Sequence, residues 1–279
     1  MMFRQCIFCG EDSSSSKSVE HIIPESLGGN KHILPVGVVC DKCNNYFARE
    51  VEKPFLEHSA IKALRFNEGI ESKKGIVPPM QAILNREHEV RLWRDNKDGF
   101  AGHIDVDVSA FNSIMAARKG TLIFPAQQDS SMLTEGPILS RFLGKVALEG
   151  FVHKILENST DSDTTKKLLD EFIRDDSFTP LKRHVRRGVT SQWLCNVRRI
   201  YSSDKKWVDT ITGEAYQVMN EFDFLITDKS ECYFILVLFG MEYAINIGGS
   251  SIDGYQEWLV NHNNSSPLYW DRNHPGHNL

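Results

Sequence analysis

The chain has no surplus of positive charge and no long apolar run. Its 279 residues carry 32 Lys and Arg against 37 Asp and Glu, a formal net charge of −5. That balance excludes a histone-like or wholly basic coat protein, so any contact with nucleic acid must be local. The strongest apolar run, around residues 233–240, is far shorter than the ~20 residues that a membrane helix needs. The first residues lack an apolar core followed by a cleavage site, and we expect a cytoplasmic protein without a membrane partner.

Cysteine is scarce as well, and its spacing tells more than its number. Four of the six cysteines form two C-x-x-C pairs, Cys6 with Cys9 and Cys40 with Cys43. In a reducing compartment, pairs this far apart favour a metal over disulfides, and four thiolates complete the tetrahedral shell of structural zinc. Gly10 directly after Cys9 permits the backbone reversal of a zinc knuckle. A redox dithiol, or four unrelated buried thiols, is the alternative interpretation.

The segment between the two pairs follows a strand, loop, strand, helix pattern. It contains the run 20–24 (EHIIP) and a Gly-Gly pair at 28–29, and an extended stretch follows at 33–39. A helix is predicted to begin near Asp41, which is a suitable N-cap. Apolar side chains then recur every fourth residue, at Phe47, Val51 and Phe55.

With these motifs, residues 3–57 resemble an HNH endonuclease of the ββα-metal class, in its subgroup with two zinc knuckles. The signature of that subgroup runs C-x-x-C, E-H-I-x-P, G-G and C-x-x-C-N, and each part is present here. The resemblance implies that His21 is the general base and that Glu20 and Asn44 bind a catalytic divalent cation. It also implies products that carry a 5′-phosphate.

The chemistry of the three side chains agrees with this resemblance. Phosphodiester hydrolysis needs a base for the attacking water and a cation for the charge that grows on the phosphoryl and leaving oxygens. An imidazole with an ordinary pKa near ~6.5 is largely neutral at cytosolic pH and accepts a proton. The oxygens of Glu20 and Asn44 suit Mg²⁺ or Mn²⁺ better than zinc. On an extended strand Glu20 and His21 point to opposite sides, so the pair can serve two tasks.

One position departs from the family pattern. Most members have an asparagine in the second strand that positions the histidine, and residues 33–36 contain none. Asn30 and His32 are the nearest substitutes, and the sequence alone leaves the choice between them open. Apart from His21, the histidines are interpreted as surface or capping residues, in particular His32, His58, His88, His103 and His153.

The rest of the chain predicts a second, larger domain. We expect an α+β protein in which residues 1–70 form a zinc-stabilised ββα-metal module and residues 76–279 form an α+β domain with a helical insertion. Helical spacing covers 138–156 and 163–174, and a hairpin is expected from 87–93 and 100–108 across a turn at 95–99. Further strands are expected at 190–202, 215–227 and 231–247. The isolated cysteines in this part are interpreted as core thiols: Cys195 and Cys232.

A local basic segment stands out against the acidic average. Between residues 182 and 206 eight Lys and Arg occur with a single acidic residue, and Trp193, Tyr201 and the adjacent Trp207 are interleaved with them. Such a segment can bind phosphates and stack on unpaired bases. In the alternative interpretation the aromatic rings face a core and the charges coat a solvated surface. The candidate nucleic-acid contacts are Lys31, Lys42, Arg49, Arg183, Arg186, Arg187, Arg198 and Arg199.

Two functions follow from these features. The first is a metal-dependent endonuclease that cleaves DNA, with RNA as an open alternative substrate and a homodimer as the simplest way to cut both strands. The second is a zinc-stabilised nucleic-acid-binding module without catalytic activity. The joint presence of Glu20, His21 and Asn44 favours the enzyme, because a binding module would not need all three.

Overall fold

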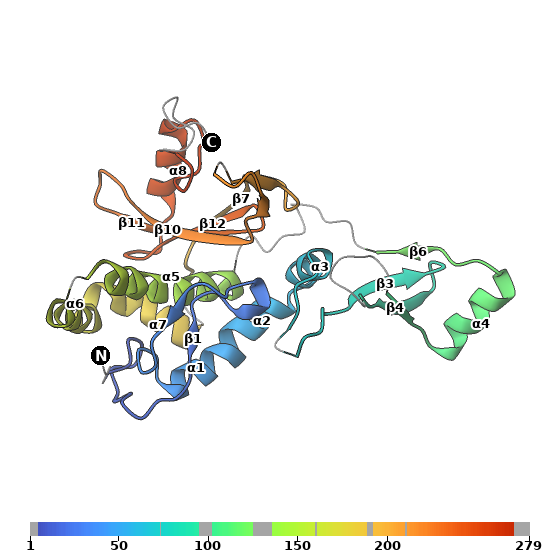
Figure 1. The fold of residues 1–279 in the computed structure, drawn as a ribbon, viewed down its shortest axis with the longest axis horizontal. Helices are drawn as coiled ribbons and strands as arrows, with labels where there is room; N and C mark the ends of the chain where they lie inside the picture. Colours follow the sequence, from blue (N-terminus) through green and yellow to red (C-terminus); the bar gives the residue numbers. More distant parts are fainter. Residues whose placement is uncertain are drawn as a thin grey trace. The chain divides into compact units, whose positions relative to one another are not determined.

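The computed structural model describes residues 5–72, 74–94, 102–124, 136–159, 161–188, 192–209 and 211–270. The chain forms two compact units (Figure 1), which combine helices with antiparallel sheets and confirm the α+β class. Unit 1 comprises Met1–Pro24, Gly28–Phe55 and Thr134–Leu279, and unit 2 comprises Glu25–Leu27 and Leu56–Leu133. The units do not coincide with the predicted domains 1–70 and 76–279, because the zinc module packs with the C-terminal half of the chain. That these domains fold independently stays a prediction.

The N-terminal part of unit 1 has the expected order of two strands and a helix. Strand β1 (Glu20–His21) pairs antiparallel with β2 (Ile33–Leu34), so that Glu20 faces Leu34 and His21 faces Ile33. The 3₁₀ turn η1 (Glu25–Leu27) lies between them in sequence. Helix α1 (Asp41–Phe47) continues through a π-helical turn, η2 (Ala48–Glu52), into α2 (Lys53–Glu57). The predicted apolar face is confirmed, because its three side chains are buried: Phe47, Val51 and Phe55.

Helix α5 (Pro137–Asn158) passes through the centre of unit 1 and confirms the predicted helix 138–156. It is buried on most of its circumference, as is typical of a core helix. Helix α6 (Ser162–Arg174), also predicted, and α7 (Thr179–Arg187), which was not, pack near it, with the short 3₁₀ turn η4 (Asp176–Phe178) between them. Helices α5 and α7 approach closely at Gly144, where a Cβ atom would lie 2.8 Å from a methyl carbon of Val185.

A four-stranded antiparallel sheet forms the rest of unit 1, in the order β10-β11-β12-β7. Its central strands, β11 (Cys232–Leu238) and β12 (Met241–Asn246), are almost entirely buried and confirm the strand predicted at 231–247 as a hairpin. One core cluster contains Tyr233 and Ile235 from the sheet and Tyr255 from α8 (Asp253–Asn261). The remaining strands are β7 (Cys195–Arg199), β10 (Asn220–Ile226) and a separate pair, β8 (Lys206–Val208) with β9 (Ala215–Gln217).

Unit 2 contains a second four-stranded antiparallel sheet, in the order β5-β4-β3-β6. Strand β4 (His88–Leu92) pairs with β5 (Ile104–Asp105) as predicted, whereas the predicted turn at 95–99 lies outside the described residues. Helix α3 (Ser59–Asn67) lies where the apolar spacing at Ile61 and Leu64 predicts a helix that restarts after Pro54. The elements of unit 2 that the sequence did not predict are β3 (Met80–Leu84), α4 (Val108–Ala117) and β6 (Leu122–Ile123).

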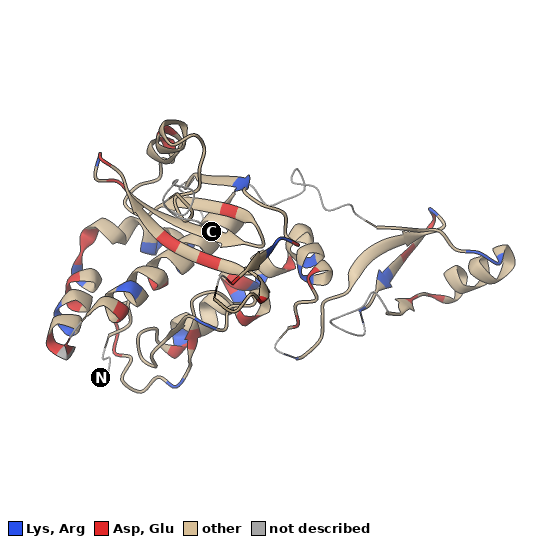
Figure 2. Ribbon diagram, turned by 45° about the horizontal axis from the view of Figure 1, so that its top comes forward, with Lys and Arg blue, Asp and Glu red and all other residues tan. Residues whose placement is uncertain are grey.

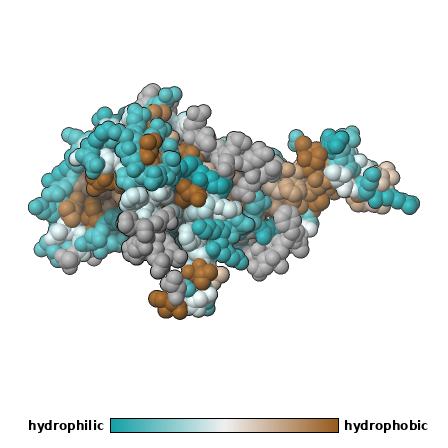
Figure 3. All heavy atoms as spheres, turned by 90° about the horizontal axis from the view of Figure 1, so that it is seen from above, coloured by the Kyte–Doolittle hydropathy of each residue, from teal (hydrophilic) through white to brown (hydrophobic). Residues whose placement is uncertain are grey.

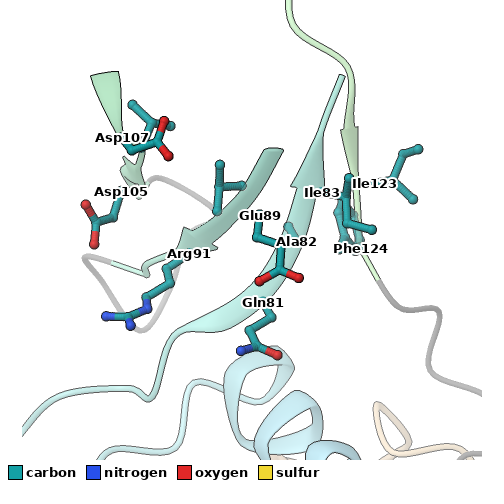
Figure 4. Close-up of a pocket in the computed structure, with 11 residues that line it drawn as sticks. Gln81, Ala82, Ile83, Glu89, Arg91, Asp105, Asp107, Ile123 and Phe124 are labelled. Atoms are coloured by element: carbon teal, nitrogen blue, oxygen red, sulfur yellow. The ribbon is translucent and has the colours of Figure 1, made fainter. Parts of the chain in front are cut away.

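The surface of unit 2 exposes many large apolar side chains. Exposed apolar side chains gather on it (Figure 3), among them Ile83, Phe111 and Met115. A cavity of about 760 Å³ opens on its sheet, with side chains such as Gln81 and Arg91 around it (Figure 4). None of the predicted catalytic residues lines this cavity.

In unit 1, helix α6 carries basic and acidic residues next to one another (Figure 2). Across the described part of the chain, we find no helix of the length and apolarity that a bilayer crossing requires.

Candidate active site and metal centre

The four cysteines of the two C-x-x-C pairs converge on one point. Their sulfur atoms all lie within 4.8 Å of one another, and the sulfurs of Cys9 and Cys40 are 3.7 Å apart. Thiolates bound to tetrahedral zinc at ~2.3 Å lie about 3.8 Å from each other. Cys6, Cys9, Cys40 and Cys43 therefore form a zinc-binding site, which confirms the prediction from spacing.

Local backbone geometry builds the two knuckles. Gly10 has a φ of +72°, and its amide donates to the carbonyl of Cys6 at 2.8 Å, which closes the first turn. The amide of Ile7 donates to the carbonyl of Val38 at 3.0 Å and joins the two knuckles. A hydrogen bond from Cys43 lowers the pKa of Cys6 to about 5, and the same hydrogen bond raises the pKa of Cys43. The two sulfurs thus share one proton, which a bound zinc ion would replace.

The helix that follows the second knuckle begins at Asp41, as predicted, but a different residue is its N-cap. Cys40 is the N-cap of α1, because its sulfur accepts from the amide of Cys43 at 3.4 Å. The prediction of Asp41 as N-cap is therefore wrong. The carboxylate of Asp41 instead accepts from the amides of Lys17 and Ser18 at 3.0 and 2.9 Å. These hydrogen bonds, above all the one from Ser18, lower the pKa of Asp41 and attach the loop before β1 to α1.

His21 is held through the main chain of the Gly-Gly pair. Its Nδ1 lies 3.0 Å from the carbonyl oxygen of Gly29. Because a carbonyl only accepts, Nδ1 carries the hydrogen, and in the neutral imidazole Nε2 then has the lone pair. Gly29 rather than either predicted substitute holds this nitrogen. The main-chain amide of Asn30 donates to the carbonyl of Gly28, and the ring of His32 contacts His153.

The same glycine is required by close packing. A Cβ atom at Gly29 would lie 1.8 Å from the carbonyl oxygen of Ile23, a distance that no side chain tolerates. The amide of Gly29 also donates to the carbonyl of Pro24, at 3.3 Å. The conformation that presents the Gly29 carbonyl to His21 thus depends on the absence of a side chain.

Asn44 ties α1 to the strand that carries His21, and the two elements lie side by side (Figure 1). Its Nδ2 donates to the carbonyl of Val19 at 3.3 Å. Because the nitrogen is bonded to a carbonyl, Oδ1 is the atom that can bind a cation. The structure therefore places Asn44 beside the start of β1.

Glu20 points to the opposite side of β1 from His21 and enters the interior. Its side chain is only 6% exposed, and Oε1 lies 2.5 Å from Nζ of Lys145 on α5. The same ammonium lies 2.8 Å from Glu52 of η2 and 2.9 Å from Glu149 of α5. Burial alone would lower the pKa of Lys145, but the three carboxylates outweigh it and raise that pKa well above its ordinary value. Burial raises the pKa of both Glu20 and Glu149.

Replacing Lys145 with methionine is expected to lower the free energy of unfolding by about 3–5 kcal/mol, because buried carboxylates would lose their counter-ion. Urea unfolding followed by circular dichroism measures this loss. Lys154→Met on the same helix is the control. Its ammonium pairs with Asp223 at 3.2 Å with both side chains partly exposed, so under about 1 kcal/mol should be lost. Equal losses in the two variants would contradict a structural role for Lys145.

Four of the predicted nucleic-acid contacts line one cavity of about 440 Å³ between α1 and α7. We call this cavity the basic pocket. Tyr46 at its wall donates a hydrogen bond to the carbonyl of Arg186 and accepts one from Arg141, which fixes α1 against α7. The bases that line the basic pocket are Lys42, Arg49, Arg186 and Arg187.

The other predicted contacts lie elsewhere. Lys31 and Arg183 are exposed, whereas Arg198 pairs with Glu242 at 2.5 Å and Arg199 donates to the carbonyl of Tyr201. Trp193 is buried and donates to the carbonyl of Asn246, so for this ring the core interpretation is correct.

Sequence reasoning missed the polar face of α5. Four of its polar residues are spaced by four, which places them along one side of the helix. The four-residue repeat is visible in the sequence, but the apolar residues of the same segment predict only a helix that packs in a core. Among these residues, His153 had been interpreted as a surface histidine. The four are Lys145, Glu149, His153 and Glu157. Cys195 and Cys232, predicted to be buried, are free and half-buried.

Comparison with known proteins adds one finding. Residues 6–60 match the model of a family described as HNH endonuclease. The matched segment contains all four zinc ligands together with Glu20, His21 and Asn44. No curated protein and no solved structure matches the chain.

Proposed function

We propose, from the match of residues 6–60 to the HNH endonuclease family, that this protein is a metal-dependent endonuclease that hydrolyses phosphodiester bonds of DNA. The observation that carries the proposal is the hydrogen bond of His21 Nδ1 to the Gly29 carbonyl. It leaves Nε2 as the proton acceptor, which is the form of imidazole that a general base needs.

In this proposal His21 takes a proton from the attacking water at Nε2. The zinc site holds α1 next to β1, so that the imidazole and the carboxamide of Asn44 stay in fixed relation. Asn44 Oδ1 and Glu20 would hold Mg²⁺ or Mn²⁺, which supplies charge stabilisation for the phosphoryl and leaving oxygens. Lys145 donates to Oε1 of Glu20, and a carboxylate has a second oxygen that could bind a cation.

The basic pocket is the proposed contact for the DNA backbone. It lies on α1, the helix that also carries Asn44, and its guanidinium groups suit phosphate oxygens. Lys42 and Arg49 come from the nuclease module, whereas Arg186 and Arg187 come from α7. Binding through this pocket should weaken as the salt concentration rises. RNA as a substrate and a homodimeric state stay predictions.

Cleavage of a supercoiled plasmid tests this function. The native chain should nick the plasmid with Mg²⁺ or Mn²⁺ and stop when EDTA is added. Asn44→Ala should need at least ~10-fold more cation, because it loses a ligand oxygen, whereas Asn44→Asp keeps an oxygen and should retain more activity. Cleavage that persists in EDTA, or equal cation requirements for native protein and Asn44→Ala, would contradict the proposal. An RNA of the same sequence, assayed in parallel, identifies the preferred nucleic acid.

A zinc-stabilised binding module without catalysis is the second candidate, because the Glu20 side chain is buried and paired with Lys145. A native chain that retards DNA in a gel, yet leaves it intact with every divalent cation, would support this function over the enzyme.

A further inference from the structure

We propose that His32, His153 and Glu157 form a second metal site, which takes a transition cation such as Zn²⁺ and is separate from the four-cysteine site. The proposal does not depend on nuclease activity. It rests on three side chains from two elements of unit 1, the loop before β2 and helix α5.

The spacing of the three donor atoms fits a shared ion. Nδ1 of His32 lies 3.1 Å from Nε2 of His153, and that nitrogen lies 3.1 Å from Oε1 of Glu157. All three ligand atoms lie within 4.8 Å of one another. Nitrogen and oxygen ligands at ~2.0–2.2 Å from a common ion are about 3 Å apart, which is the separation seen here.

Hydrogen bonds alone cannot satisfy all three side chains at once. Nε2 of His153 faces both the His32 ring and the Glu157 carboxylate. If Nε2 of His153 carries a hydrogen, that single hydrogen faces two groups at 3.1 Å and can be donated well to only one of them. If Nε2 instead accepts from His32, it has no hydrogen for Glu157. A cation at the centre accepts lone pairs from all three groups at once.

The surroundings favour an open transition-metal site. The ring of Phe222 packs on both imidazoles, with centroid distances of 4.9 Å to His32 and 6.3 Å to His153. Glu157 is 51% exposed, so water can complete the coordination. Two imidazoles and one carboxylate suit zinc and its neighbours in the transition series, whereas Mg²⁺ prefers oxygen ligands.

An ion at this site would connect α5 to the hairpin of the nuclease module. The carbonyl of His32 accepts from the amide of Ile22 at 3.1 Å, and Ile22 is the neighbour of His21. Coordination of His32 to α5 therefore restrains the strand that carries His21. The proposed role is a clamp between the two elements.

Metal content and calorimetry test the site on the full-length, zinc-loaded chain in excess Mg²⁺. The native protein should bind two zinc ions per chain. His153→Ala should bind one, and Glu157→Gln should bind the second ion at least ~10-fold more weakly. His103→Ala, which removes an exposed imidazole of unit 2, should behave as the native protein. Zinc should raise the unfolding temperature of the native chain further than that of His153→Ala.

Three outcomes would overturn the proposal. The first is a single zinc per native chain when zinc is in excess. The second is a second zinc ion that His153→Ala retains, because the ion would then lie elsewhere. The third is unchanged affinity in Glu157→Gln, a nearly isosteric change at an exposed side chain that folding should tolerate.

Discussion

Replacing His21 with alanine is expected to lower the rate of plasmid cleavage by ~10²–10⁴-fold, the usual contribution of a general base. The physical reason is the loss of Nε2, which the hydrogen bond to Gly29 leaves as proton acceptor. The measurement is single-turnover cleavage at saturating Mg²⁺, so that the loss reports on the chemical step rather than on binding.

The variant should keep its zinc, its far-ultraviolet circular dichroism and its affinity for DNA, because His21 is half-buried and ligates none of the structural zinc. Free imidazole in the buffer should restore part of the rate. His103→Ala removes an exposed ring and serves as the matched control. Equal cleavage by His21→Ala and the native protein would remove His21 from the mechanism.

The double replacement of Cys40 and Cys43 by serine is expected to release the structural zinc and to unfold the module around it. Structural zinc contributes on the order of 10 kcal/mol to the folding of small units. The segment it supports has two-residue strands and a short helix, which bury too little apolar surface to fold alone. Cleavage should fall to background, and zinc content by atomic emission should fall by one ion per chain.

The chain supplies its own control for this experiment. Cys195→Ser and Cys232→Ser change cysteines outside the cluster of four. Burial raises the pKa of these two thiols to about 12 and about 11, so neither is a ready ligand. Both variants should keep zinc and activity. A Cys40→Ser/Cys43→Ser protein that retained its zinc and its rate would show that the ion is held elsewhere.

The zinc centre could be predicted because its information is local. Each C-x-x-C pair forms its own knuckle, and Cys40 in addition caps the helix that carries Cys43. Asn44 directly follows the second knuckle in sequence, and the proposed base, His21, lies between the two knuckles. Their relation in space therefore follows from a short stretch of chain, which is the condition under which residue patterns predict geometry.

The partners supplied by distant residues could not be predicted in this way. Lys145 lies 125 residues from Glu20, and Arg186 lies more than a hundred residues from Lys42. Residue patterns predicted a helix at 138–156 and a basic segment at 182–206, but they do not say which distant residues these segments contact. The Gly29 carbonyl was missed for a different reason, because a main-chain acceptor leaves no mark on residue identity.

The buried ammonium of Lys145 has a consequence for isolated fragments of the N-terminal zinc module. Two of the three carboxylates that contact it, Glu20 and Glu52, belong to the N-terminal segment, while the cation itself comes from α5. A fragment that ends near residue 70 would contain these two acidic side chains without the ammonium that stabilises them. The N-terminal segment therefore depends on the C-terminal half of unit 1 for the cation that its buried acidic side chains require.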